Sequence, residues 1–207
     1  MIKKLTRPLL ALVVAFCSMH APVAGANVTP AAPAPELALM TATGQICGLI
    51  KDHFAEYKGN SGALYSAVEQ VLVPRFDVSG IARLVLAANY RAATPEQRTR
   101  FAAAFKEVLV HTYANALLDN CNAASIDWKP THLPENATDA VVNAALARAD
   151  GRALAIGFRV HVVDADWKIY DIAIENVSLI LNFRTQINAA INGTSLDKVI
   201  ARMESGR

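Results

Sequence analysis

The chain has 207 residues, of which 53% are hydrophobic, and it carries 20 basic and 18 acidic side chains. A chain of this length can bury one good core, so a single domain is expected. Three of the basic residues precede Ala26, so the remainder is close to neutral and offers no charge basis for binding nucleic acid.

Residues 1–26 have the pattern of a secretory signal peptide. Lys3, Lys4 and Arg7 precede an apolar run from Leu9 to Met19, and Ala24-Gly25-Ala26 supplies the small residues that signal peptidase requires. The apolar run is shorter than the roughly 20 residues that span a bilayer, which disfavours a membrane anchor. We therefore expect cleavage after Ala26 and a soluble protein in the periplasm.

Residues 27–35 are rich in Pro and Ala and are predicted to form an extended tether. Apolar residues at helical spacing then start a single domain, expected over 36–207, with a first helix that ends before the turn cluster 59–62. A second helix is predicted from Ala63 to Val73, and Asp77 can cap a third.

The strongest local signal is Thr94-Pro95-Glu96-Gln97, which combines a Thr cap, a Pro at the first helical position and a Gln that can reach back to the cap. A long helix should start here. Its apolar face is broad and rich in aromatic residues, and such a face usually packs in a core. The face contains Phe101, Phe105, Val108, Leu109, Thr112, Tyr113 and Leu117.

Cys47 and Cys121 remain after removal of the signal peptide and would meet an oxidising compartment. A disulfide between them would close a long loop. Two separately buried thiols explain the sequence equally well, because Cys often serves as a small core residue. Both alternatives stay open at this stage.

Four strands are predicted after residue 124, at 125–128, 140–148, 154–163 and 167–175, with turn residues between them. Short connections favour antiparallel pairing. The second strand holds many small residues, which leave space above a sheet.

The last of these strands is apolar on both sides. Strict alternation puts Trp167 and Ile169 on one face, and Ile172 and Ile174 on the other. An antiparallel sheet usually has one solvated face, so the second apolar face needs a cover. We expect one face to pack on helices and the other to look into a cavity.

Two further amphipathic stripes, at 179–191 and 196–203, predict C-terminal helices. The expected fold class is therefore α+β: a curved antiparallel sheet of about four strands, with N-terminal and C-terminal helices packed around it, enclosing a hydrophobic cavity.

Signals for catalysis are scarce. The chain has no Gly-x-Ser-x-Gly elbow, no phosphate loop and no dinucleotide fingerprint. The histidines are scattered, and none forms a set with metal-ligand spacing. We expect no enzyme activity, no cofactor and no metal.

Several segments share their order and spacing with one known family. They are Val73-Pro74-Arg75-Phe76-Asp77, Ala93-Thr94-Pro95-Glu96-Gln97-Arg98, Thr112-Tyr113, and Trp167 to Ile172 running on through Ser178 to Arg184. The chain resembles the toluene-tolerance family, which includes the periplasmic phospholipid-shuttle proteins of the Mla lipid-transport system. The chain departs from that family at Leu86-Ala87, where the family has Leu-Gly, and at Glu175-Asn176, where it has Glu-Gly.

The resemblance implies a soluble periplasmic carrier that holds the acyl chains of a diacyl phospholipid and transfers the lipid between outer- and inner-membrane transport complexes. It would dock transiently on these complexes and act as a monomer. The alternatives are a carrier for hopanoid or another apolar lipid, a small isomerase or hydrolase with a pocket acid or base, and an adaptor with a filled core.

The residues expected to contact lipid are the apolar residues of the long helix, of the two-sided strands and of the neighbouring helices. They are Leu84, Phe105, Leu109, Tyr113, Val142, Ile156, Phe158, Val160, Tyr170, Ile172, Ile174 and Phe183.

Overall fold

The structure is a computed structural model that describes residues 34–123, 125–134, 136–147 and 152–206. The expected signal peptide, 1–26, and nearly all of the expected tether, 27–35, lie outside these residues. Pro35 is the first residue of a helix. Within the described ranges, no helix is both long enough and apolar enough to cross a membrane.

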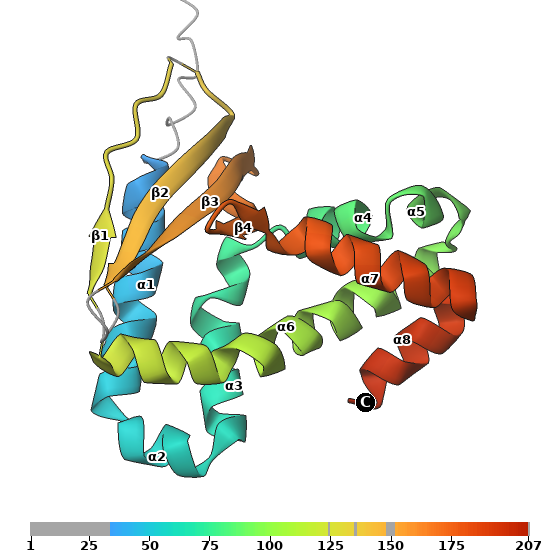
Figure 1. The fold of residues 1–207 in the computed structure, drawn as a ribbon, viewed down its shortest axis with the longest axis horizontal. Coiled ribbons are helices and arrows are strands. Elements are labelled where there is room, and N and C mark those ends of the chain that lie inside the picture. Colours follow the sequence, from blue (N-terminus) through green and yellow to red (C-terminus); the bar gives the residue numbers. More distant parts are fainter. Residues whose placement is uncertain (1–33, 124, 135, 148–151, 207) are drawn as a thin grey trace, which may run out of the picture.

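The fold is a five-stranded antiparallel sheet with helices before and after it, which confirms the α+β class (Figure 1). The strands follow one another in the sheet in chain order: β1 (Ile126–Trp128), β2 (Asp139–Ala147), β3 (Ala153–Val163), β4 (Asp166–Ile174) and β5 (Val177–Ser178). The helices are α1 (Pro35–Asp52), α2 (Phe54–Gly59), α3 (Ser61–Val71), α4 (Val78–Leu86), α5 (Ala88–Ala92), α6 (Pro95–Ala123), α7 (Leu179–Gly193) and α8 (Leu196–Glu204), with a 3₁₀ turn, η1, at Val73–Arg75.

Two helix starts form as the sequence predicts. The carboxylate of Asp77 accepts a hydrogen bond from the backbone N–H of Gly80 at 2.8 Å, which caps α4. At α6, the Gln97 N–H donates to Thr94 Oγ1 at 3.1 Å and the Thr94 N–H donates to Gln97 Oε1 at 2.9 Å, which is a complete capping box. The first predicted helix is divided at His53 into α1 and α2.

The hairpins around β4 use two-residue turns in which both residues have positive φ. Asp164 and Ala165 have φ values of 51° and 64°, and Glu175 and Asn176 have values of 49° and 64°. Such turns match the right-handed twist of the flanking strands. The Asn at the family's Gly position therefore does adopt the left-handed conformation, which Asn tolerates better than most residues.

The expectation of two apolar faces on β4 is wrong, because a β-bulge interrupts its alternation. Ile169 pairs with Val160 and Asp171 pairs with Arg159, so Tyr170 is one residue more than β3 can match. Residues paired across two strands share a face. The bulge therefore places Trp167 and Ile169, which precede it, on the same face as Ile172 and Ile174, which follow it.

Within the described residues, the packed interior consists of three clusters of buried side chains. The first joins α1, α2 and α3 to the C-terminal half of α6, around Ile46 and Leu118. The second joins α4, α7 and α8 to the N-terminal half of α6, around Phe101 and Ile200. The third joins α1 to the sheet through Leu39, which packs against β2, β3 and β4. Figure 1 shows α6 passing from the first group of helices to the second.

Candidate ligand cavity

A cavity of about 390 Å³ lies where the three clusters meet. Each cluster supplies part of its wall: Leu39 comes from the sheet cluster, Ile46 from the cluster of the N-terminal helices, and Phe105 from the cluster of the C-terminal helices. Further walls come from η1, from the first residues of α7 and from the apolar face of β1 to β4. The centre of the domain is therefore a space between cores and not one continuous core.

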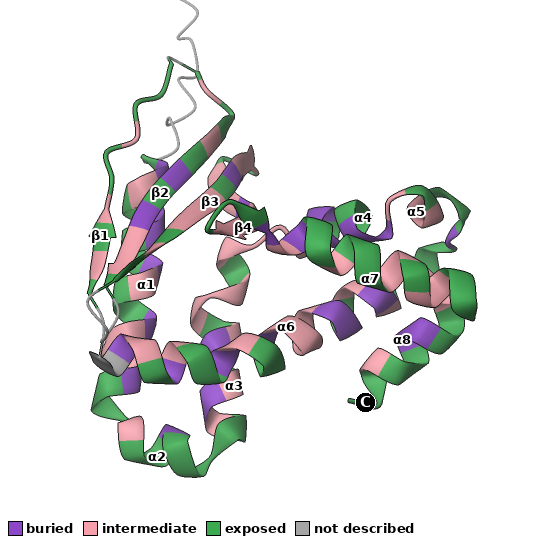
Figure 2. Ribbon diagram, viewed as in Figure 1, coloured by how far each residue is buried: buried purple, intermediate pink, exposed green. Residues whose placement is uncertain are grey.

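The wall is mainly apolar, and many of its side chains keep some exposure. Ile156, Phe158, Ile172 and Ile174 face this space from β3 and β4 and are only partly buried, in contrast to the fully buried Val142 and Val160. Figure 2 shows β3 and β4 mostly in the colour of partly buried residues. Partly exposed apolar side chains that converge on one enclosed space are typical of a site for an apolar ligand.

Two cationic residues reach the described part of the wall, and each is paired. Arg75 Nη1 lies 3.3 Å from Asp166 Oδ2. Lys106 Nζ contacts Glu69 and lies 2.7 Å from Glu107 Oε1, and hydrogen bonds to these two carboxylates raise the pKa of Lys106. The hydrogen bond from Lys106 in turn holds the pKa of Glu69 below its usual value. Neither cation is left uncompensated for an anionic ligand.

Asp171 is the only Asp, Glu or His on the described part of the wall. Its Oδ2 accepts from the Ser178 hydroxyl at 2.7 Å, its Oδ1 accepts from the Ile180 N–H at 3.2 Å, and Arg159 Nη1 lies 3.8 Å away. Ser178 Oγ accepts from the Leu181 N–H at 3.0 Å, so the pair Asp171 and Ser178 caps α7. The carboxylate holds a helix start in place, and the described wall offers no free acid or base for an isomerase or hydrolase.

Tyr113 is the aromatic residue of the wall that carries a hydroxyl group. It is partly buried on α6, and this burial raises the pKa of its phenol. The phenol is therefore protonated, and able to donate a hydrogen bond, throughout the neutral pH range.

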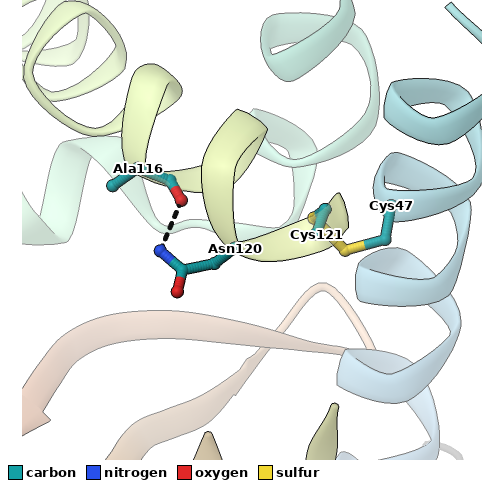
Figure 3. Close-up of a disulfide and its surroundings, with 4 residues drawn as sticks. All are labelled: Cys47, Ala116, Asn120 and Cys121. Carbon is teal, nitrogen blue, oxygen red and sulfur yellow. Dashed lines mark hydrogen bonds between the residues drawn. A yellow bond between two sulfur atoms is a disulfide. The ribbon is translucent and has the colours of Figure 1, made fainter. Parts of the chain in front are cut away.

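A disulfide between Cys47 and Cys121 joins α1 to the end of α6, with the two Cα atoms 4.9 Å apart (Figure 3). The sequence leaves open a disulfide or two separate thiols, and the structure contains the disulfide. Both cysteines belong to the cavity wall, as does Asn120, whose Nδ2 donates to the Ala116 carbonyl at 2.7 Å. The bridge thus joins two walls of the cavity.

The structure brings seven of the twelve predicted contact residues together on the wall. They are Phe105, Leu109, Tyr113, Ile156, Phe158, Ile172 and Ile174.

The other five predicted residues lie elsewhere. Val142 and Val160 are fully buried in the sheet cluster, next to Leu39. Tyr170 packs with the C-terminal helices, because the bulge turns it away from the apolar face of β4. Phe183, on α7, packs in the same cluster. Leu84, on α4, is 39% exposed and does not belong to the described cavity wall, in contrast to its prediction.

Sequence reasoning missed the contribution of the N-terminal helices to the wall. The cavity is lined from α1 by Leu39 and Ile46, from α3 by Val68, and by Leu72, which directly follows α3. The stripe on α1 is visible in the sequence, but a stripe looks the same whether it meets side chains or a ligand. Nothing in the local pattern could have separated the two.

A second depression, of about 580 Å³, lies on the outside between α1 and α3. It is more open than the cavity, and small or polar residues such as Gly44, Gly48 and Gln70 form much of its surface. We place the candidate site in the smaller cavity, because its walls are more enclosed and more apolar than those of the outer depression.

Comparisons with known proteins identify relatives over most of the chain. The model of the MlaC protein family matches residues 40–205. The toluene tolerance protein Ttg2D of Pseudomonas putida is 31% identical over 207 residues, covering 97% of this chain and 89% of that protein. A solved structure of a phospholipid-binding protein from Ralstonia solanacearum, in complex with a phospholipid, has a TM-score of 0.75 and 26% identity, covering 83% of this chain and 95% of the other.

Proposed function

Because the chain belongs to the MlaC protein family, we propose that it is a lipid carrier that holds the acyl chains of a phospholipid in the cavity between its sheet and α6. The observation that carries this proposal is the partly enclosed apolar cavity at the meeting point of three packed clusters. The similarity to a protein solved with a phospholipid supports the choice of ligand class.

The energetics favour an enclosed site. Exposing one methylene to water costs about 0.8 kcal/mol, so a diacyl lipid with about thirty methylenes faces a gross penalty of roughly 25 kcal/mol in an aqueous gap. A dry apolar cavity removes the part of that penalty that belongs to the methylenes it encloses. Carriage then requires binding and release only, which fits a wall without a free acid or base.

The carrier would work in the periplasm, between complexes of the outer and inner membranes, as a monomer that docks transiently. The signal-peptide pattern of residues 1–26 supports export across the inner membrane. A near-neutral mature chain is consistent with brief contacts on more than one partner, because it carries no strong field of one sign.

Native mass spectrometry of the protein purified gently from cells tests the proposal. We expect a fraction of the protein to carry a mass shift that equals one or more diacyl phospholipids, identified by fragmentation. Protein that is entirely free of lipid under gentle conditions would contradict the proposal. A bound hopanoid would show that the protein carries a lipid, but not a phospholipid.

A pair of neighbouring substitutions locates the ligand. Ile156→Trp adds bulk to the cavity wall and should strongly reduce the fraction of lipid-bound protein. Ala155→Trp adds the same bulk on the opposite face of β3, where Ala155 is exposed, and should leave lipid occupancy unchanged. Equal lipid occupancy in the two folded variants would place the lipid outside this cavity.

A further inference from the structure

The polar groups on the cavity wall differ in whether they already have a partner. Arg75, Lys106 and Asp171 are paired within the protein, and Asn120 donates to a carbonyl of its own helix. The hydroxyl of Tyr113 has no hydrogen-bond partner among the described residues, and neither does the hydroxyl of Thr43. A ligand can therefore gain a new hydrogen bond from these two hydroxyls without breaking an existing one.

Tyr113 differs from Thr43 in what its hydroxyl can reach. A Thr hydroxyl inside a helix can turn back to the carbonyl four residues earlier, as Thr112 does to Val108 at 2.6 Å. A phenol hydroxyl lies too far from its own backbone for that bond. The Tyr113 hydroxyl is therefore available to a ligand in the cavity or to water.

Tyr113 also lies at the boundary between the apolar interior and the solvent. On α6, Ala114 is fully buried, Ala116 is exposed, and Tyr113 is partly buried. Leu109 and Leu117, one turn before and one turn after it, are partly buried lining residues that flank the ring with apolar surface. The phenol is thus a single hydrogen-bond donor on an otherwise apolar stretch of wall.

A diacyl phospholipid places a matching acceptor at such a boundary. Its methylene chains belong in the apolar interior and its charged head group in water, because burying a charge without a partner is unfavourable. The two ester carbonyls lie between them. We propose that the Tyr113 hydroxyl donates a hydrogen bond to an ester carbonyl of the bound lipid and thereby makes the carrier prefer ester-linked lipids. This inference rests on the proposed function.

The experiment compares two lipids and three proteins. The lipids are dipalmitoyl phosphatidylethanolamine and its dihexadecyl ether analogue, which keeps the chain length and head group but lacks the carbonyls. The proteins are delipidated wild type, Tyr113→Phe and the control Tyr65→Phe. Relative affinities come from competition between the lipids, measured by native mass spectrometry.

We expect Tyr113→Phe to bind the ester lipid about three- to tenfold more weakly than wild type, equivalent to roughly 0.7–1.4 kcal/mol at 1.4 kcal/mol per factor of ten, and to bind the ether lipid as wild type does. Tyr65→Phe, which removes a phenol hydroxyl from a residue of α3 that does not line the cavity, should match wild type with both lipids. Equal weakening for the two lipids, or no weakening for either, would overturn the inference. Wild type that binds neither lipid would instead overturn the proposed function.

A second measurement does not depend on a variant. With lipid labelled with ¹³C at the ester carbonyls, the infrared band of the carbonyl should split on binding to wild type, with one component at the lower wavenumber of a hydrogen-bonded ester. A bound-state band at the position found for the lipid in a dry apolar solvent would overturn the inference.

Discussion

At the scale of single residues, Ala87 is a site of backbone strain. It joins α4 to α5 with φ 53° and ψ −117°, a combination that Gly adopts freely and that costs other residues of order 1–3 kcal/mol. The family that this chain resembles has Gly at the same place in its Leu-Gly pair. The structure therefore shows why that position favours Gly, and that Ala here keeps the conformation in spite of its Cβ.

We predict that Ala87→Gly raises the free energy of unfolding by about 1 kcal/mol, since the relief of strain exceeds the added entropy of the unfolded chain. Urea unfolding monitored by circular dichroism measures this change in the free energy of unfolding. Ala88→Gly is the matched control: Ala88 begins α5 with ordinary helical geometry, so Gly there should be neutral or destabilising. An Ala87→Gly protein no more stable than wild type would show that the backbone at this position is unstrained.

At the scale of elements, the bulge in β4 and the disulfide decide how the cavity is walled. The bulge at Tyr170 gathers the apolar side chains of β4 on one face, where α1 covers the part near Trp167 and the cavity takes the part near Ile174. The disulfide attaches the opposite wall, the end of α6, to α1. The bulge and the disulfide therefore position different walls of the same cavity.

We predict that the double variant Cys47→Ala, Cys121→Ala stays folded but releases lipid faster. The bridge closes a loop with a sequence separation of 74 residues, which the chain-entropy model values at about 4 kcal/mol. The freed end of α6 should show faster amide hydrogen exchange, and lipid transfer to acceptor vesicles should accelerate.

The control for this prediction must lose stability without touching the wall. Leu64→Ala suits, because Leu64 is fully buried on α3 and packs in the first cluster but does not line the cavity. Large-to-small changes of this kind cost about 2–5 kcal/mol. If lipid release from Leu64→Ala is as fast as from the double cysteine variant at similar stability, the bridge contributes only to overall stability and does not hold the wall.

At the scale of the whole molecule, three separate clusters meet at a cavity where a domain of this size could have one continuous core. An empty cavity deprives its lining of dispersion contacts, and filling it restores them. A ligand that binds only the folded state also stabilises that state by mass action, by about 2.7 kcal/mol at a hundredfold excess over the dissociation constant. Stability should therefore depend on whether lipid is present.

We predict that delipidation lowers the midpoint of thermal unfolding by several degrees and that added diacyl phospholipid restores it. Differential scanning calorimetry of the lipid-bound and delipidated protein measures the change. The Ile156→Trp variant, with its cavity reduced, should show a smaller difference between the two states. If the midpoint of thermal unfolding is the same with and without lipid, the cavity does not hold the lipid.

The sequence alone determines much of this protein because the signals involved are local. The caps at Asp77 and Thr94 predict where α4 and α6 start, turn residues predict where the hairpins lie, and motif order identifies the family. More than half of the predicted contact residues line the cavity, because apolar periodicity finds the faces that point inward.

Only the tertiary structure decides which inward-pointing residues meet one another and which meet a cavity. Pairing with β3 reveals the extra residue at Tyr170, and that single insertion reverses the face of every side chain after it. The bond between Cys47 and Cys121 and the exposure of Leu84 likewise depend on how distant elements pack. A cavity is a volume that side chains leave empty, and no local pattern encodes that volume.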